Sequence, residues 1–187
     1  MTTPDRVPPG QTATAKWPVL TYGDVPQIDP ARWRFRIWGA VESPRQWTWA
    51  ELSALPVVES QSDIPCVPRW SRLDTHWRGV RPRDLLAAAR PRPEARHIMV
   101  HAEPDYTTNL PLEALLDDDV LLAHMVLGKP LTAEHGGPVR LVVPKRYGWK
   151  SAKWLTGIEL HAEDQPGFWE VRGYHNEADP WREERFR

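Results

Sequence analysis

Two features of the sequence could support chemistry: a single cysteine, Cys66, and a basic segment far downstream of it. A cysteine thiolate can attack an electrophile or bind a soft metal ion, so its reactivity depends on the pKa of the thiol. Arg69 and Arg72 follow within a few residues, and we expect their charges to lower that pKa. One cysteine cannot complete a zinc or iron–sulfur site, so a metal bound to Cys66 would take its remaining ligands from a cofactor.

The basic segment covers residues 129–153 and has the composition of an anion-binding loop. It contains six lysines and arginines and only one acidic residue, Glu134. Its three glycines allow the backbone to approach a ligand closely, and Ser151 adds a hydroxyl group. The sequence has no Walker motif and no Gly-x-Gly-x-x-Gly, so the common nucleotide sites are not indicated. We therefore expect a local site for a phosphate group, with a solvated basic surface as the alternative.

The elements that must position these residues are short, because the chain contains twenty prolines. Prolines at this density favour a strand-rich domain over long helices, and the eleven tryptophans can line a pocket or anchor the core. A capping box at Thr48 to Glu51 predicts a short helix that Pro56 ends, and Pro65 places Cys66 in a loop at the edge of an element. We expect strands at 33–38, 97–102, 120–127, 139–143 and 154–161, and short helices at 83–90 and 112–116.

The charges of the whole chain are nearly balanced, with 24 lysines and arginines against 25 aspartates and glutamates. No overall field favours nucleic acid, and we expect no nucleic-acid partner. The longest apolar run, residues 120–127, is far shorter than the ~20 residues that span a bilayer, so stable membrane insertion is not expected. Residues 1–8 lack the pattern of an export signal, which predicts a cytoplasmic protein.

Three motifs, taken in order and spacing, resemble the molybdopterin-binding domain of the sulfite oxidase superfamily. The first is Cys-Val-Pro-Arg-Trp-Ser at 66–71, followed by Trp-Arg-Gly-Val at 77–80. The second is His-Gly-Gly-Pro-Val-Arg-Leu at 135–141, and the third is Tyr-Gly-Trp-Lys-Ser-Ala-Lys-Trp-Leu at 147–155. The chain is most similar to small stand-alone bacterial members, which resemble the catalytic subunit of the methionine-sulfoxide reductase. The resemblance runs from about Val19 to the Asp-Pro-Trp element at 179–181.

This resemblance implies an α+β fold, a single mixed, β-rich domain with short helices that binds molybdenum-molybdopterin. We expect an irregular arm at 1–18 and the molybdopterin-binding oxidoreductase domain at 19–187. The metal would be held by the pterin dithiolene and by Cys66, and Tyr106 would orient the oxygen that is transferred. The residues implied to hold the pterin and its phosphate are His101, His135, Arg140, Lys150, Ser151 and Lys153.

The implied activity is two-electron oxygen-atom transfer. The resemblance favours reduction of an S- or N-oxide, with oxidation of sulfite as the alternative. The chain is too short for the haem and dimerisation domains of sulfite oxidases, so a separate electron-transfer partner is expected. Pro68 stands where related chains often carry a polar residue, which leaves the substrate class open. Residues 17–23 do not match the reductase pattern, and we assign no pterin contact there.

Two functions of other classes stay open at this stage. Cys66 could be the nucleophile of a metal-free hydrolase or transferase, with His101 or His135 as its base. Alternatively, the protein could be a binding module in which tryptophans form a ligand platform and the cysteine is inert. The tryptophans of that platform would be Trp70, Trp77 and Trp149.

Overall fold

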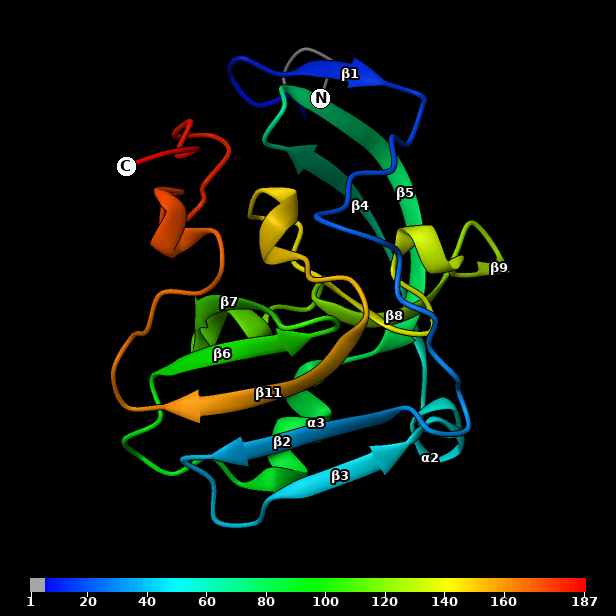
Figure 1. The fold of residues 1–187 in the computed structure, drawn as a ribbon, viewed down its shortest axis with the longest axis vertical. Helices are drawn as coiled ribbons and strands as arrows, with labels where there is room; N and C mark the ends of the chain where they lie inside the picture. The colour runs from blue at the N-terminus through cyan, green and yellow to red at the C-terminus, as the bar shows by residue number, and fades with distance from the viewer. Residues whose placement is uncertain (1–5) are drawn as a thin grey trace.

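The computed structural model describes residues 6–187, which form two mixed β-sheets with short helical turns around them (Figure 1). The first sheet has six strands. Its path runs β1 (Thr12–Thr14), β5 (Trp70–Val80), β8 (Leu121–Val126) and β10 (Arg140–Val142). Two further strands pair with members of this path: β4 (Val58–Cys66) with β5, and β9 (Lys129–Pro130) with β8.

The second sheet has five strands in the order β3-β2-β11-β6-β7. In chain order they are β2 (Arg34–Gly39), β3 (Arg45–Thr48), β6 (His97–Ala102), β7 (Tyr106–Pro111) and β11 (Leu155–His161). β11 pairs in parallel with β2, and the other pairs are antiparallel. β5 runs along the long axis of the molecule in Figure 1, and the strands of the second sheet run across it. This mixed, β-rich arrangement confirms the predicted α+β fold class.

The main core lies on the inner face of the second sheet, and strict alternation in β2 explains why. Phe35 and Ile37 are fully buried, while Arg34 and Arg36 point outward and leave their charges near water. In β6 the same alternation buries Ile98 and Val100 and turns the histidines to the outer face. The predicted strands at 33–38, 97–102, 120–127, 139–143 and 154–161 are all confirmed within one or two residues.

The two helices begin where the sequence predicts. α2 (Trp49–Ser53) starts with a complete capping box, because the Thr48 hydroxyl accepts the Glu51 amide and the Glu51 carboxylate accepts the Thr48 amide. α3 (Pro82–Ala89) has proline in its first turn. Residues Leu112–Leu116 form a 3-10 turn, and three more such turns lie at Ala133–His135 (η2), Gly148–Lys150 (η3) and Glu170–Arg172 (η4). Within residues 6–187, no helix is long and apolar enough to cross a membrane.

The longest strand pair, β4 with β5, was not predicted. Both strands are rich in charged and hydroxyl side chains, which hide the alternation that marks a half-buried strand. Their pairing shifts between Ser62 and Ile64, and Asp74 beside this β-bulge adopts a left-handed φ of 52°. On the side of the bulge toward the β4–β5 turn, the register places Cys66 opposite Trp70. The cysteine is therefore the last residue of β4 rather than part of a loop.

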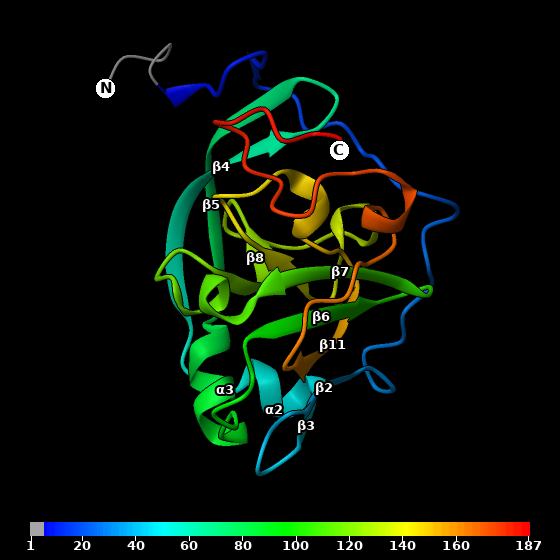
Figure 2. The ribbon, with the colours of Figure 1, turned by 90° about the vertical axis from the view of Figure 1, so that its left-hand side faces the viewer.

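The arm predicted as irregular at 1–18 contains the short strand β1. β1 pairs in parallel with the start of β5, with Thr12 opposite Trp70. Beyond β1 the chain continues along the outside of the molecule until it enters β2, a course that both views show (Figures 1 and 2). The guanidinium of Arg185 also reaches the carbonyls of Pro9 and Gly10, at 3.3 and 3.4 Å. The two ends of the described chain therefore meet beside the β4–β5 hairpin.

Candidate active site

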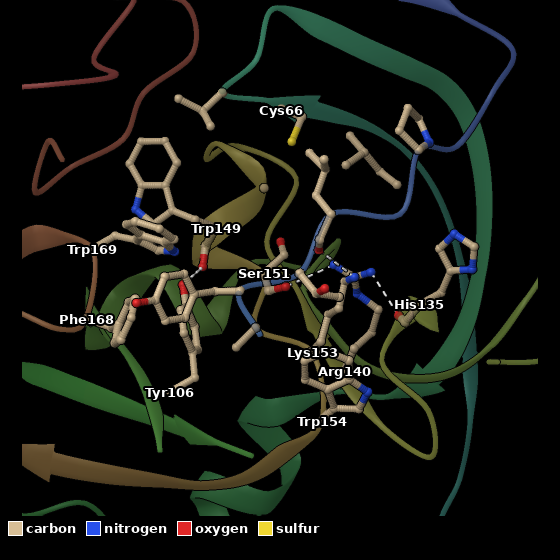
Figure 3. Close-up of a pocket in the computed structure, with 18 of the residues that line it drawn as sticks. Cys66, Tyr106, His135, Arg140, Trp149, Ser151, Lys153, Trp154, Phe168 and Trp169 are labelled. Carbon is tan, nitrogen blue, oxygen red and sulfur yellow. Dashed lines mark hydrogen bonds between the residues drawn. The ribbon is translucent and has the colours of Figure 1, made fainter. Parts of the chain in front are cut away.

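A cavity of about 390 Å³ lies where the arm, the end of β4, the basic segment and the C-terminal segment meet (Figure 3). Six of the eight predicted site residues line it, although they come from distant parts of the sequence. They are Cys66, Tyr106, His135, Arg140, Ser151 and Lys153. Two further predicted residues, His101 and Lys150, do not line this cavity.

Cys66 is half-buried at the edge of the cavity, close to the turn η3. A methyl group added at Gly148 would lie 3.6 Å from the Cys66 Sγ, so glycine leaves the thiol room on that side. Burial raises the pKa of the Cys66 thiol to about 11, and the nearby charges of Arg140 and Lys153 offset this only in part. An isolated thiol in this position is therefore protonated at neutral pH.

The predicted role of Arg69 and Arg72 in lowering the pKa of Cys66 is wrong. Neither side chain lines the cavity, and neither contributes to the pKa shift of the thiol. Arg72 lies over the ring of Trp17, with 5.0 Å between its guanidinium carbon and the ring centroid. Proximity in sequence does not fix direction: Arg69 lies in the turn between β4 and β5, and Arg72 lies on β5, where side chains point to alternate faces.

Arg140 is the buried centre of the basic side of the cavity. Its guanidinium donates to the carbonyl oxygens of His135 at 3.0 Å and of Ser151 at 2.9 Å, so it fixes the two loops that carry the other polar groups. Burial lowers the pKa of Arg140 to about 10, which still leaves it charged at neutral pH. The Ser151 hydroxyl accepts the amide of Val143 at 2.8 Å and keeps its own proton for a further partner.

Lys153 connects the basic side of the cavity to the arm. Its ammonium donates to the carbonyls of Leu20 at 2.8 Å and of Glu134 at 2.7 Å. Burial, and then the positive charge of Arg140, lower the pKa of Lys153 to about 8. The side chain therefore carries its charge at neutral pH but loses it in mildly alkaline solution.

His135 lines this side of the cavity and has one ring nitrogen without a partner within residues 6–187. Its Nδ1 lies 3.1 Å from the Thr132 hydroxyl, whereas its Nε2 is buried without a hydrogen-bond partner among the described residues. Burial lowers the pKa of His135, and the nearby charges of Lys153 and Arg140 act in the same direction, so the ring is neutral at pH 7. A buried polar atom without a partner is uncommon in folded proteins and indicates a position where a ligand can bind.

Tyr106 lies at the start of β7 on the side of the cavity away from Arg140. Its hydroxyl donates to the Trp149 carbonyl at 2.6 Å. Burial, and then the negative charge of Glu170, hold the pKa of Tyr106 well above its ordinary value. The group is therefore a neutral phenol whose oxygen can accept a hydrogen bond.

Lys150, predicted to contact the cofactor, is fully buried on the opposite side of turn η3. Its ammonium lies 2.7 Å from the Glu170 carboxylate and donates to the backbone and side-chain oxygens of Asn109. Successive residues of a tight turn point in different directions, so Trp149 and Ser151 face the cavity while Lys150 faces β7. Its position indicates a structural ion pair.

His101, also predicted to contact the pterin, lies on the outer face of β6. It contacts Glu159 at 3.0 Å and Trp38, with 4.9 Å between ring centroids. It lines a second cavity of about 610 Å³ between the outer face of the sheet and residues 26–32. Glu103 lines both cavities, so the two are neighbours.

Two groups of cavity residues were not predicted from the sequence. The first comes from the arm, where no pterin contact was assigned, and comprises Trp17, Pro18, Leu20, Thr21 and Tyr22. The second is aromatic and comes from the C-terminal segment: Phe168, Trp169 and Tyr174. The abundance of tryptophan was the only available signal, and five of the eleven tryptophans do line the cavity, namely Trp17, Trp70, Trp149, Trp154 and Trp169.

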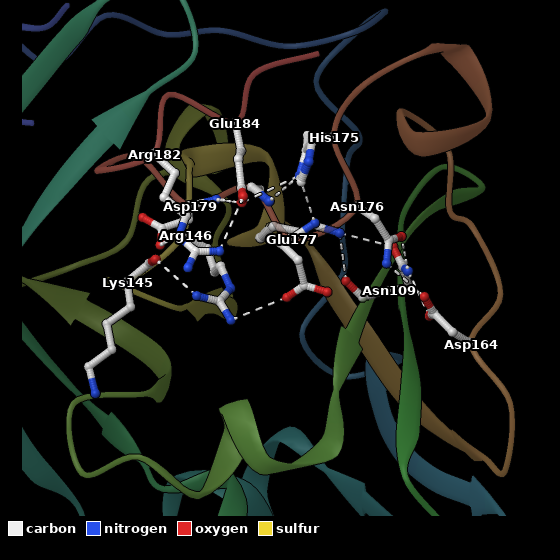
Figure 4. A network of polar contacts seen from close by, with 12 residues as sticks. Asn109, Lys145, Arg146, Asp164, His175, Asn176, Glu177, Asp179, Arg182 and Glu184 are labelled. Atoms are coloured by element: carbon white, nitrogen blue, oxygen red, sulfur yellow. Dashed lines mark hydrogen bonds and ion pairs between the residues drawn. The ribbon is translucent and has the colours of Figure 1, made fainter. Parts of the chain in front are cut away.

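A polar network holds the C-terminal segment in place (Figure 4). The side-chain amide of Asn109 donates to Asp164 at 2.7 Å and to Asn176 at 2.6 Å. Arg146 lies 3.6 Å from Glu177. These contacts join the segment that carries the aromatic cavity residues to β7 and to the basic segment, so the two sides of the cavity are fixed relative to each other.

The residues on the basic side offer a hydroxyl, an unpaired imidazole nitrogen and two cations around one cavity, beside a thiol. This set suits a bound group with polar edges and an anionic end. Among residues 6–187, no three histidine, cysteine or acidic side chains are arranged to hold a metal ion.

Comparisons with known proteins agree with this chemistry. The family described as "Oxidoreductase molybdopterin binding domain" matches residues 22–169. The chain is 48% identical over 182 residues to the uncharacterized oxidoreductase YuiH of Bacillus subtilis, covering 97% of this chain and 92% of that protein. It is 30% identical over 156 residues to the putative protein-methionine-sulfoxide reductase subunit YedZ1 of Azospira oryzae, covering 82% of this chain but 59% of that protein.

The fold also matches a solved structure, the sulfane dehydrogenase SoxCD from Paracoccus pantotrophus. The TM-score is 0.70 at 23% sequence identity, and the match covers 80% of this chain and 42% of that chain. At this identity the likeness concerns the fold alone. It places the two sheets in a known architecture.

Proposed function

Because this chain belongs to the oxidoreductase family with a molybdopterin-binding domain, and is thus an enzyme with molybdenum-molybdopterin as its cofactor, we propose that it reduces an organic S- or N-oxide at the cavity beside Cys66. When bound, the cofactor supplies two-electron oxygen-atom transfer. Reduction of a sulfoxide consumes two electrons and two protons and releases the sulfide and one water. The electrons would come from a separate redox partner.

The residues around the cavity fit this cofactor. A pterin has polar ring edges and its side chain ends in a phosphate, and the basic side of the cavity offers matching partners. The imidazole of His135 lines the cavity, and the free proton of the Ser151 hydroxyl can bind the polar edges. Arg140 and Lys153 supply positive charge for the anionic end. Cys66 would be the protein ligand of the metal.

The high pKa of Cys66 supports the role of a metal ligand over that of a nucleophile. A hydrolase would need a thiolate in the free enzyme, which requires a lowered pKa, whereas burial raises this pKa to about 11. A bound metal cation removes the proton from a coordinating thiol without help from a base. His135, the one proposed base that shares the cavity, is not hydrogen-bonded to Cys66.

Tyr106 would position an oxygen atom rather than carry a proton away. Its phenol stays neutral and its proton is held by the Trp149 carbonyl, so its oxygen can accept a hydrogen bond from water or from a substrate group. Because the Trp149 carbonyl belongs to turn η3 and Ser151 directly follows this turn, the turn links the tyrosine to the basic side of the cavity. Sulfite oxidation, the reverse direction of oxygen transfer, is the alternative that a substrate comparison must decide.

The first experiment measures molybdenum and pterin in wild-type and Cys66→Ala protein produced with molybdate in a host that makes the cofactor. We expect about one molybdenum per wild-type chain, and loss of sulfoxide-reducing activity in Cys66→Ala, whose far-UV circular dichroism should be unchanged. Arg69→Gln is a matched control, because this exposed residue does not line the cavity. Absence of both molybdenum and pterin, in a host where another molybdoenzyme loads normally, would contradict the proposal.

A further inference from the structure

The cavity has two chemically different halves, and Cys66 lies between them (Figure 3). The cationic half contains His135, Arg140, Ser151 and Lys153. The aromatic half lies on the other side of Cys66 and contains Tyr22, Tyr106, Trp149, Phe168, Trp169 and Tyr174. The cationic half suits the cofactor, so the aromatic half is the part of the cavity that remains for a substrate.

The aromatic half is a packed set of rings. The ring of Phe168 has neighbours on several sides, at centroid distances of 5.0 Å to Tyr22, 5.7 Å to Tyr106 and 5.1 Å to Trp169. Trp169 in turn contacts Tyr174 at 4.8 Å. Most of these pairs meet edge to face or tilted, the favourable geometry for aromatic rings. The rings therefore support one another and form an ordered apolar wall.

No cation of the described structure is available to a ligand in this half. Arg172 lies over the Phe168 ring at 3.7 Å and donates to the Phe168 carbonyl, but it does not line the cavity. Lys150 is paired with Glu170 beneath the turn. The acidic residue on the cavity wall is Glu103. An anion entering here would lose hydration and meet ring faces, which carry partial negative charge.

Two of the polar groups among these rings are already paired with protein atoms, whereas the Trp169 indole and the Tyr22 and Tyr174 hydroxyls are neutral groups without such a bond among the described residues. The indole of Trp149 donates to Glu170 at 2.9 Å, and the Tyr106 hydroxyl donates to the Trp149 carbonyl. A ligand in this half therefore meets ring faces and a few neutral hydrogen-bonding groups, so dispersion and the exclusion of water dominate its recognition, and an anionic substituent would find no cation there.

Resting on the proposed function, we propose that the aromatic half binds the organic substituents of a neutral, apolar S-oxide, such as an aryl alkyl sulfoxide, and that Phe168 and Tyr22 contribute to this specificity. The sulfoxide oxygen would point toward Cys66. In the reaction the sulfur–oxygen bond breaks, sulfur gains two electrons from the redox partner, and the oxygen leaves as water with two protons. Sulfite and other small anions are poor ligands of this half.

The test compares methyl phenyl sulfoxide, dimethyl sulfoxide and sulfite in wild-type, Phe168→Ala, Tyr22→Ala and Trp181→Ala proteins. Tyr22 lies at the rim with 64% of its surface exposed, so its replacement should not disturb folding. Trp181 is exposed and lies outside the cavity, which makes it the matched control. With dithionite-reduced viologen as donor, we expect wild-type kcat/KM to favour the aryl substrate by about tenfold or more, the discrimination that an apolar pocket gives for added apolar groups.

Phe168→Ala and Tyr22→Ala should lower kcat/KM for methyl phenyl sulfoxide while changing that for dimethyl sulfoxide little, and Trp181→Ala should resemble wild type. Equal kcat/KM for the two sulfoxides, or a higher kcat/KM for sulfite oxidation, assayed separately with ferricyanide as electron acceptor, than for reduction of either sulfoxide, would overturn the assignment.

A binding measurement separates this inference from the proposed function. Methyl phenyl sulfone, an uncharged analogue that the enzyme should not reduce, is titrated into the same proteins by calorimetry, with and without molybdenum. Weaker binding to Phe168→Ala and Tyr22→Ala than to Trp181→Ala supports the aromatic half as an apolar site even if no sulfoxide is reduced. Equal binding to all the proteins would overturn the inference even if sulfoxides are reduced.

Discussion

The indole of Trp17 stacks on the imidazole of His135, with ring centroids 3.8 Å apart and ring planes inclined by 27°. Trp17 belongs to the arm, whereas His135 lies in the basic segment that we propose holds the pterin. The same indole meets Trp77 edge to face at 5.6 Å and lies beneath the Arg72 guanidinium. The arm therefore closes the cationic half of the cavity from outside, and Lys153 ties it down again at Leu20.

We predict that Trp17→Ala weakens the retention of the cofactor by about three- to tenfold, because a stacked aromatic contact contributes about 0.5–1.5 kcal/mol beyond its buried area. The measurement is the molybdenum that remains after gel filtration at increasing dilution, together with limited proteolysis of residues 15–24. Trp181→Ala is the control, since that exposed indole does not line the cavity. Equal retention by both variants would show that the arm does not close the site.

The raised pKa of Cys66 predicts slow alkylation of cofactor-free protein. Only the thiolate reacts with iodoacetamide, and a pKa of about 11, compared with an ordinary value of 9.0, lowers the thiolate fraction at pH 8 roughly a hundredfold. The rate, followed by mass spectrometry, should keep rising with pH up to about 11, whereas the rate for an unfolded cysteine peptide levels off near 9. Rapid alkylation at pH 7 would instead favour the cysteine-nucleophile hypothesis.

The lowered pKa of Lys153 predicts that anion binding weakens in mildly alkaline solution. Because the ammonium is charged below about pH 8 and neutral above it, sulfate affinity of cofactor-free protein should fall as pH rises from 7 to 9.5. A bound anion stabilises the charged form, which moves the midpoint above 8. Sulfate keeps a constant charge over this range, so calorimetric titration reports the protein group.

Two variants check that assignment. Lys153→Arg should remove most of the pH dependence, because a guanidinium stays charged throughout the range. Lys129→Met, at an exposed position outside the cavity, should leave it unchanged. A pH dependence that persists in Lys153→Arg would assign the titration to another group.

The Lys150–Glu170 pair predicts a large effect on stability. The Glu170 carboxylate also accepts hydrogen bonds from Thr108 at 3.0 Å and from Trp149, and both members of the pair are fully buried. Lys150→Met should therefore lower the free energy of unfolding by about 3–5 kcal/mol, the usual cost of leaving a buried charge unpaired. Urea denaturation measures this, and the double variant Lys150→Met, Glu170→Gln should lose less than the single one.

The residues that the sequence alone could place are those with a strong local pattern. Alternation in β2 and β6 and the capping box at Thr48 predicted their elements from adjacent residues. The charge density of the basic segment likewise indicated an anion site, and His135, Arg140, Ser151 and Lys153 do meet in one cavity.

The sequence could not predict which way a side chain points, or which segments far apart along the chain meet in the fold. Lys150 has the same charge as Lys153, and only the path of turn η3 sends one inward to Glu170 and the other to the cavity. His101 lies on β6, a regular strand in which the side chains at odd-numbered positions face outward. The aromatic half combines the arm with the C-terminal segment, and irregular segments carry no periodicity from which such contacts could be inferred.

The bulge at Asp74 sets the register between β5 and the end of β4 that carries Cys66. The position of the thiol therefore depends on the number of residues in β5. An antiparallel pair that slips by one residue turns every side chain to the opposite face, and Cys66 lies beyond the bulge. The Asp74 amide is held by the Asp63 carboxylate at 2.9 Å, and Arg6 contacts both acids. The loss or gain of a single residue between positions 71 and 75 should therefore remove the thiol from the cavity.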